Sequence, residues 1–193
     1  MVGPIGKKPP GKSDIEMNKE KILVLDTETT GFDKAAEILQ LSILNGNGEV
    51  LMNEYFRPRH TVSWAGAQQV NHISPAMVAG KPPLSVRKQA IEVLLQGADM
   101  IAGYNLPFDL RMLGQNGIGI PDKDKVRYLD LMRPFSETYG DINEKTGRYR
   151  WQKLITCAKY YGYEEGGWHD SLADTRATLY CFWKMAADGT ITI

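Results

Sequence analysis

The segment KILVLDTETTG, residues 21–31, is an apolar run of strand length followed at once by acidic and hydroxyl side chains. Such a run indicates a strand buried in the middle of a sheet, and Gly31 suits the loop that follows it. Residues two apart in a strand point to the same side, so the carboxylates of Asp26 and Glu28 converge where this strand ends. Two close carboxylates repel each other unless a cation joins them. The segment therefore predicts a central strand with an acidic site at its C-terminal end.

The rest of the chain supplies the other strands and the helices. Residues 38–44 and 50–56 are strand candidates joined by Asn45-Gly-Asn-Gly48, and Asn-Gly pairs favour a hairpin. After Pro58 the periodicity becomes helical, with short strand candidates at 99–103 and 125–129. The expected helices are 106–113, 131–139, 151–161 and 171–187, with helical stripes also at Trp64, Ala67 and Val70 and at Val86, Ala90, Val93 and Leu94, and a polar loop at 140–150. Three antiparallel strands followed by two parallel ones predict an α/β fold, a mixed five-stranded sheet flanked by helices.

The composition limits the class of protein. With 193 residues, 42% hydrophobic and 24% charged, the chain is typical of one globular domain. Residues 1–20 are rich in Pro, Gly and Lys, so we expect a flexible arm there and one domain over residues 21–190. Lys+Arg 23 balance Asp+Glu 23, which excludes the basic excess of a protein that coats nucleic acid. The absence of a long apolar span and of a signal peptide excludes a membrane partner, and two buried, reduced thiols at Cys157 and Cys181 indicate a cytoplasmic location.

Two further acidic motifs stand where helices are expected to begin. Asn105-Leu-Pro-Phe108-Asp109 follows the strand at 99–103, and His169 precedes Asp174 by five residues. Each has a purely structural interpretation, because Asn105 suits a helix cap and Ser171 with Asp174 resembles a capping box. A single Asp-x-Glu also arises by chance, as at Asp14-Ile-Glu16. It is the joint occurrence of three motifs, one at a strand end and two at helix starts, that favours catalysis.

Together the three motifs resemble those of the DEDDh group of 3′-to-5′ exonucleases, the superfamily of the proofreading ε subunit of bacterial DNA polymerase III, ribonuclease T and oligoribonuclease. The resemblance covers roughly residues 21–187, and Asp170 stands where the sister group has Tyr. It implies a ribonuclease H-like fold and hydrolysis that releases nucleoside monophosphates from 3′ ends of DNA or RNA. The implied catalytic residues are Asp26, Glu28, Asp109, His169 and Asp174.

The resemblance also implies two divalent cations, and carboxylate ligands without thiolates suit Mg²⁺ or Mn²⁺. Asp26 is the expected bridging ligand, with Glu28 and Asp174 on the ion next to the nucleophile and Asp109 on the second ion, partly through water. Such an ion pair activates water and stabilises the leaving 3′-oxygen. His169 is the expected general base, because an imidazole pKa of about 6.5 suits proton transfer at neutral pH.

Substrate contacts are expected next to the metal ligands. Phe32 either stacks on a terminal base or packs as an ordinary core residue. The resemblance adds the Asn and Phe of the second motif. The residues expected to bind substrate near the ions are Thr29, Thr30 and Gly31 through their backbone amides, Phe32, Asn105 and Phe108. Arg148 and Arg150 lie among Tyr and Trp residues and either hold backbone phosphate or belong to a solvated loop.

The expected partners are single-stranded or frayed 3′ ends of DNA or RNA and, for a proofreading enzyme, a DNA polymerase. Two other functions compete: a nucleic-acid-binding module that has lost turnover, and a related metal-dependent phosphatase or endonuclease. The complete carboxylate and His set favours the exonuclease, since fold alone does not choose. Tyr104 stands where many members have His, and residues 140–150 look like an insertion, so DNA or RNA preference and oligomeric state stay open.

Overall fold

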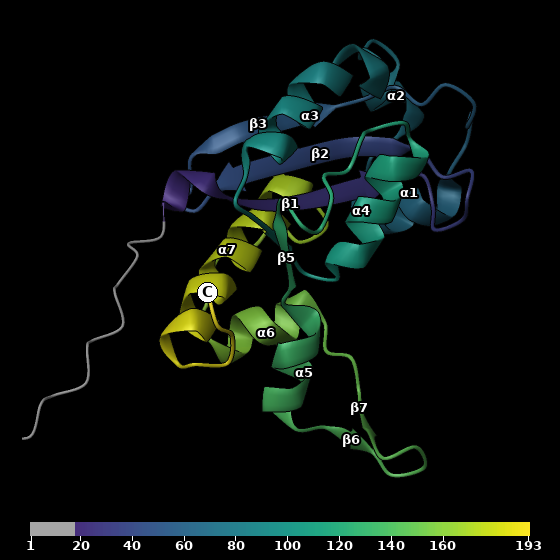
Figure 1. Cartoon of the computed structure of the whole chain (residues 1–193). Coiled ribbons are helices and arrows are strands. Elements are labelled where there is room, and N and C mark those ends of the chain that lie inside the picture. The colour runs from purple at the N-terminus through teal and green to yellow at the C-terminus, as the bar shows by residue number, and fades with distance from the viewer. Residues whose placement is uncertain (1–17) are drawn as a thin grey trace, which may run out of the picture.

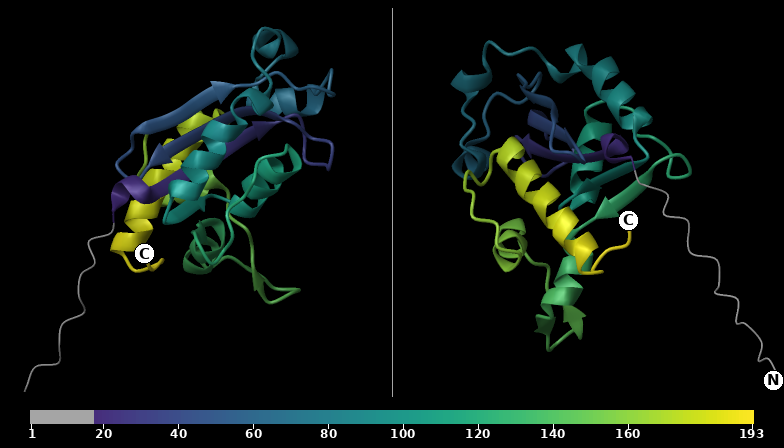
Figure 2. Two further views of the ribbon diagram at one scale, coloured as in Figure 1. Left: turned by 45° about the horizontal axis from the view of Figure 1, so that its top comes forward. Right: turned by 90° about the vertical axis from the view of Figure 1, so that its left-hand side faces the viewer.

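The computed structural model describes residues 18–193 and contains a twisted five-stranded sheet with helices on both faces (Figures 1 and 2). The strand order is β3-β2-β1-β4-β5; β1 to β3 are antiparallel, and β4 and β5 run parallel to β1. The strands are β1 (Ile22–Thr29), β2 (Ile38–Asn45), β3 (Val50–Tyr55), β4 (Met100–Gly103) and β5 (Arg127–Asp130). The mixed α/β sheet predicted from the sequence is confirmed.

The helices fill the connections between the strands and follow the last one. They are α1 (Ala65–Asn71), α2 (Pro75–Val78), α3 (Lys88–Gly97), α4 (Leu106–Gln115), α5 (Met132–Tyr139), α6 (Leu154–Tyr160) and α7 (Ser171–Ala187), with 3-10 helices η1 (Lys19–Lys21) and η2 (Leu84–Val86). Over residues 18–193, no helix combines the length and the apolar character needed to cross a membrane.

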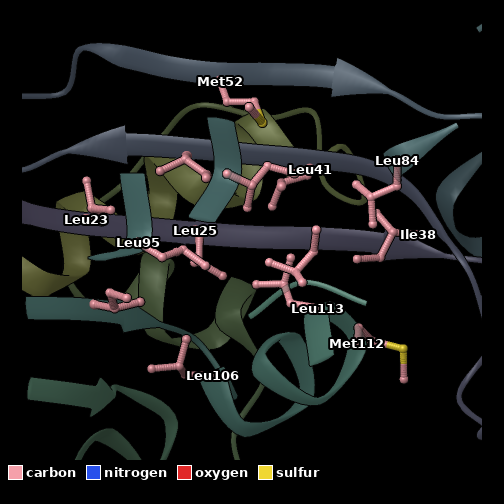
Figure 3. Packing of buried hydrophobic residues seen from close by; sticks show 14 of the residues in the cluster. Leu23, Leu25, Ile38, Leu41, Met52, Leu84, Leu95, Leu106, Met112 and Leu113 are labelled. Atoms are coloured by element: carbon pink, nitrogen blue, oxygen red, sulfur yellow. The ribbon is translucent and has the colours of Figure 1, made fainter. Parts of the chain in front are cut away.

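Strand β1 divides its side chains between two cores. Leu23 and Leu25 face α3 and α4 in the cluster of Figure 3, where they meet Leu95 and Leu106. Ile22 and Val24 face the other way, into the core formed with α5, α6 and α7. Each fully buried Leu or Ile contributes about 1.5–3 kcal/mol, so β1 is held from both faces.

Helix α7 is the long yellow helix lying across one face of the sheet in Figure 2. It packs on β1, β2 and α6 through a buried stripe that includes Ala177, Cys181 and Phe182. Cys157 on α6 lies in the same core, and both cysteines are buried free thiols, as expected. This packing fixes the first turn of α7 beside the end of β1.

The structure corrects several predicted boundaries. Strand β1 runs through residues 26–29 instead of ending at Leu25, because β2 continues to pair with it as far as Thr29. Residues 140–150, predicted as a loop, contain a two-stranded hairpin of β6 (Ile142–Asn143) and β7 (Arg148–Tyr149) that projects from the domain (Figure 1). The following helix begins at Leu154 instead of Trp151.

The stripe predicted through Val86, Ala90, Val93 and Leu94 is wrong except for Leu94, which packs against the core. Val86 and Val93 are each 63% exposed, and α3 instead turns Ile91 and Leu95 into the core. Val86 and Val93 are about two helical turns apart, and Ile91 and Leu95 are about one turn apart. Both spacings fit a helical stripe, so spacing alone did not reveal which stripe faces the sheet.

Residues 18–20, which the sequence analysis placed in an arm, contact the domain, while residues 1–17 lie outside the described part. Asn18 caps η1, and the Lys19 ammonium lies 4.6 Å from the centre of the Trp183 ring. The Gly46 N–H donates to the Lys19 carbonyl at 2.8 Å. A Cβ at Gly46 would come within 2.7 Å of that oxygen, so this close approach requires glycine.

Candidate active site

The acidic residues of β1 face the first turn of α7. Asp26 and Glu28 have the same parity as Ile22 and Val24 and so share their side of the sheet. In the antiparallel ladder, Asp26 pairs with Ser42 and Glu28 pairs with Gln40. The register of two strands thus places both carboxylates under the start of the last helix.

Asp109 reaches the same region from α4, on the other side of the sheet. It is 2% exposed, and its Oδ1 accepts hydrogen bonds from the Thr27 N–H at 3.0 Å and the Thr27 hydroxyl at 2.7 Å. Thr27 stands between Asp26 and Glu28 and points toward α4. Three consecutive residues of β1 therefore point Asp26 and Glu28 to one side of the sheet and Thr27 to the other, where it donates two hydrogen bonds to Asp109.

The turn before α4 differs in detail from the prediction. Asn105 occupies the cap position in the left-handed conformation, with φ 65°, but among the described residues its side chain makes no capping bond. The carboxylate of Asp130, at the end of β5, accepts from the backbone N–H groups of Asn105 at 2.8 Å and Leu106 at 3.3 Å. Asp130 therefore caps the helix, a role that only the parallel pairing of β4 and β5 reveals.

The first turn of α7 holds the third motif. Asp170 is the cap, and its Oδ1 accepts from Leu172 N and Ala173 N at 3.1 Å each. The alternative interpretation of Ser171 and Asp174 as a capping box therefore does not hold. His169 adopts a left-handed conformation, with φ 68°, and its N–H donates to Asp174 Oδ2 at 3.2 Å. Asp174 Oδ1 is buried and has no hydrogen-bond partner within residues 18–193.

Three of the five predicted catalytic side chains form a candidate metal site. Ligand atoms of Glu28, His169 and Asp174 all lie within 4.8 Å of one another. A buried carboxylate oxygen without a donor is costly unless something compensates its charge, and Asp174 Oδ1 is such an atom. Hard oxygen ligands suit Mg²⁺ or Mn²⁺, so the residues present fit a divalent cation.

Burial and mutual repulsion raise the pKa values of the carboxyl groups in this cluster. Burial is the main cause that raises the pKa of Glu28 to about 8, of Asp109 to about 7 and of Asp174 to about 6. The pKa of Asp26 lies well above its ordinary value, first through burial and then through the charge of Asp109 and that of Glu28. The charge of Asp170 adds to this field, although the sequence analysis gave that residue no role. A bound cation would reverse this penalty.

Phe32 and Phe108 each stand near a predicted metal ligand in the sequence, and their rings lie close to each other. Phe32 is 77% exposed, so it is not an ordinary core residue, and its ring centre lies 5.9 Å from that of Phe108. The Arg111 guanidinium lies 5.3 Å from the Phe108 ring centre and donates to the Phe32 carbonyl at 3.1 Å. Arg111 was missed because it lies outside the second motif, and its hydrogen bond to Phe32 joins residues that are far apart in the sequence.

The residues between β1 and Phe32 are engaged in the turn. The Thr29 hydroxyl donates to the Gly31 carbonyl at 2.7 Å, and the Thr30 hydroxyl accepts from Glu37 N at 2.9 Å. Asn71, also missed, donates through Nδ2 to the Thr29 carbonyl at 3.1 Å, and its side chain lowers the pKa of Glu28 against the larger effect of burial. These bonds fix the loop that follows the acidic pair.

The two predicted arginine contacts are not brought to the carboxylates. Arg148 and Arg150 lie on or next to the projecting hairpin, which Figure 1 shows beyond α5 and away from β1. Arg150 pairs with Asp141 at 3.4 Å. Arg148 instead lines a cavity of about 510 Å³ together with Arg133, Tyr149 and Trp151.

The fold and the acidic cluster define a DEDD-type 3′-to-5′ exonuclease superfamily domain. Residues 23–182 match the model of the RNase_T family, described as Exonuclease, and the chain belongs to this family of exonucleases. The resemblance predicted from the three motifs is confirmed.

Individual relatives agree with this assignment. The chain is 27% identical over 175 residues to the uncharacterized exonuclease CP81 of Escherichia phage 186, covering 86% of this chain and 89% of the phage protein. It is 28% identical over 195 residues to the PolC-type DNA polymerase III of Staphylococcus saprophyticus, covering 94% of this chain and 12% of the polymerase. Exonuclease X, solved in complex with 5′ overhanging duplex DNA, superposes with a TM-score of 0.64 at 19% identity, over 89% of this chain and 94% of that one, which shows the shared fold.

Proposed function

We propose that this exonuclease removes nucleotides one at a time from single-stranded or frayed 3′ ends of DNA, using two divalent cations and His169 as general base. The observation that carries the proposal is the grouping of Glu28, His169 and Asp174 around an unpartnered buried carboxylate oxygen among the described residues. The DNA named with Exonuclease X and the polymerase context of the PolC-type relative favour DNA as the substrate.

The carboxylates would together hold the two ions. Asp26, whose pKa is raised by the charges of Asp109, Glu28 and Asp174, would be a ligand, and Glu28 with Asp174 would hold an ion near His169. Asp109 would serve the second ion through Oδ2, because Thr27 occupies Oδ1. When bound, the ions supply an activated water and charge stabilisation for the leaving oxygen.

His169 would take the proton from the attacking water. Its backbone N–H is tied to Asp174, and its ring lies within reach of the Glu28 carboxylate. In the reaction, the water oxygen bonds to phosphorus as the bond from phosphorus to the 3′-oxygen breaks. His169 takes the water proton, and the departing 3′-oxygen acquires a proton from solvent, leaving a shorter strand and a nucleoside 5′-monophosphate.

The substrate strand would be held at two places. Near the ions, the backbone of residues 29–31 would meet the terminal nucleotide, Asn105 would line its path, and the exposed Phe32 on Phe108 would stack on a base. Farther away, the hairpin cavity offers Arg148 for a phosphate and Trp151, which is 64% exposed, for a base. The pairing of Arg150 with Asp141 makes Arg150 the weaker candidate for a phosphate contact.

The deciding experiment uses 5′-labelled single-stranded DNA, single-stranded RNA and a duplex with a mismatched 3′ end, each with Mg²⁺, Mn²⁺ or EDTA. We expect a ladder of shortening DNA products with either metal and intact substrate with EDTA. Internal cuts, release of inorganic phosphate alone, or binding without shortening would each point to one of the competing functions. Faster removal of the mismatched end than of a matched one would support a proofreading role with a polymerase.

A further inference from the structure

A buried polar residue on β2 connects the sheet to the first turn of α7. Gln40 is 1% exposed, and its Oε1 accepts from Ser171 N at 3.2 Å. Its Nε2 donates to Asp170 Oδ2 at 3.0 Å and to Asn53 Oδ1 at 3.1 Å. The amide of Gln40 therefore contacts both the cap of α7 and its first backbone N–H.

The same amide stands directly opposite a proposed metal ligand. In the ladder of β1 and β2, Gln40 is the partner of Glu28. Four residues after Asp170, Asp174 donates its backbone N–H to the Asp170 carbonyl at 2.9 Å. One rigid path thus runs from Glu28 across the ladder to Gln40, then to Asp170 and up one helical turn to Asp174.

Two neighbours complete the connection. The Tyr55 hydroxyl donates to Asp170 Oδ2 at 3.2 Å, and the hydroxyls of Ser42 and Ser171 lie 2.7 Å apart. Asp170 has both oxygens engaged, Oδ1 by the helix and Oδ2 by Gln40 and Tyr55. Its carboxylate is therefore committed to holding α7, which distinguishes it from the unpartnered oxygen of Asp174.

We propose that Gln40 is a positioning residue that sets the separation of Glu28 and Asp174, and with it the affinity of the site for its divalent cation. This inference rests on the proposed metal ligands and adds a residue that positions two of them. Residues that orient metal ligands through hydrogen bonds typically change metal affinity by about 10–100-fold when replaced. Among the described residues, the Gln40 side chain forms no hydrogen bond with a proposed ligand. Gln40 acts on Glu28 through the ladder of the two strands and on Asp174 through the first turn of α7.

The informative substitution is Gln40→Glu, which keeps the size and the oxygen facing Ser171 N but replaces the Nε2 donor by an acceptor. A Glu carboxyl has at most one proton to donate, whereas the Gln40 Nε2 donates to both Asp170 and Asn53. The variant therefore either repels Asp170 Oδ2 as a charged group or loses one of these two bonds, and in both cases the first turn of α7 is held less tightly to β2. We expect Mn²⁺ to bind about 10-fold more weakly or worse. Turnover at saturating Mn²⁺ should fall while KM for the oligonucleotide changes little, because the strand-binding loops are not touched.

Two variants calibrate the result. Tyr55→Phe removes one hydrogen bond to Asp170 from a partly exposed residue, so it should weaken Mn²⁺ binding in the same direction but less, and it keeps the test open if Gln40→Glu folds poorly. Asn53→Ala removes a hydrogen-bond acceptor from Gln40 and Ser42, and among the described residues Asn53 has no side-chain hydrogen bond to α7. Asn53 is exposed, so water can replace it, and its Mn²⁺ affinity should match the wild type.

The measurements are the Mn²⁺ dissociation constant by calorimetry and the exchange rate of the Ser171 amide in the metal-free protein. Asp174→Asn serves as the reference for the proposed ligands. Weaker binding in Gln40→Glu and Tyr55→Phe, with faster Ser171 exchange and an unchanged Asn53→Ala, supports the inference. If Asp174→Asn weakens Mn²⁺ binding and neither Gln40→Glu nor Tyr55→Phe does, the inference is overturned and the function stands. If Asp174→Asn itself has no effect, the proposed ligand set fails.

Discussion

Thr27 donates two hydrogen bonds to a single oxygen of Asp109, from its backbone N–H at 3.0 Å and from its hydroxyl at 2.7 Å. Both favour the charged carboxylate and lower the pKa of Asp109, against the larger effect of burial, which holds it at about 7. Asp109 thus keeps one oxygen fixed and the other available, although Thr27 is not a metal ligand.

Thr27→Val removes only the hydroxyl donor from this pair. Because a hydrogen bond to a charged group contributes about 1.5–3 kcal/mol, the pKa of Asp109 should rise further in the variant. The loss of Mn²⁺ affinity between pH 8.5 and pH 7 should therefore be larger than in the wild type. Calorimetric titration at the two pH values measures this difference. Thr29→Val is the matched control, because the Thr29 hydroxyl donates to a backbone carbonyl. An equal effect from both variants would contradict the role of Thr27.

The metal-free protein should lose stability as the pH rises. Burial holds the folded-state pKa of Glu28 at about 8, of Asp109 at about 7 and of Asp174 at about 6, all above their ordinary values. A raised folded pKa stabilises the fold fully only below the unfolded pKa, near 4, and that contribution is lost as pH rises through 6 to 8. We expect the melting temperature with EDTA to fall between pH 5 and about pH 8.5, and Mn²⁺ to oppose this fall. A flat profile with EDTA would show that the pKa values of these carboxyl groups are not raised in the folded protein.

Asp26→Asn removes one repelling charge and the proposed bridging ligand. The metal-free variant should be at least as stable as the wild type, with a much smaller gain on adding Mn²⁺. For one site, an ion at 100 times its dissociation constant stabilises by about 2.7 kcal/mol. Denaturant unfolding with and without Mn²⁺ gives both quantities. A variant that is less stable without metal, yet gains as much from Mn²⁺ as the wild type, would make Asp26 a structural residue.

His169→Asn tests the general base without straining the turn. Asn tolerates the left-handed conformation that His169 adopts, whereas Ala does so less well. Turnover on single-stranded DNA should fall by about 10²-fold or more, since a general base typically contributes 10²–10⁴. Mn²⁺ affinity should stay nearly unchanged. A large loss of Mn²⁺ affinity would instead show that His169 is a metal ligand, which its closeness to Glu28 and Asp174 would also allow.

The two arginines of the hairpin should behave differently. Arg148→Ala should weaken single-stranded DNA binding and lower the salt slope by about 1, as expected for one phosphate contact. Trp151→Ala should cost about 1–3 kcal/mol if a base stacks there. Arg150→Ala is the control, because Arg150 is paired with Asp141. Equal losses for Arg148 and Arg150 would favour a diffuse charge effect over a defined contact.

The sequence was sufficient for the sheet and for the members of the acidic cluster. Local patterns carry that information: the apolar run before Asp26, the Asn-Gly hairpin, and two motifs at helix starts. The local sequence is enough to predict where a strand ends and where a helix begins. In the folded sheet, the order of the strands then brings the end of β1 close to the beginnings of α4 and α7.

The residues that hold the cluster in place could not be found in this way. Gln40 and Ser42 lie in the strand predicted at 38–44 without any predicted role, and only the folded structure shows that they face Asp170 and Ser171. The cap supplied by Asp130 likewise depends on pairing between β4 and β5. Such roles arise from contacts between residues far apart in the chain, which neither periodicity nor motif spacing encodes.

The proposed ligands come from β1, α4 and α7, and Asp174 stands on the last helix of the fold. During synthesis, the strand that bears Asp26 and Glu28 leaves the ribosome well before the helix that bears Asp174. The partly synthesised chain would therefore have an incomplete set of metal ligands, and no active site, until α7 packs on β1 and β2. Activity would thus appear only at the last stage of folding, so a nascent or unfinished chain would pose no danger to nearby nucleic acid.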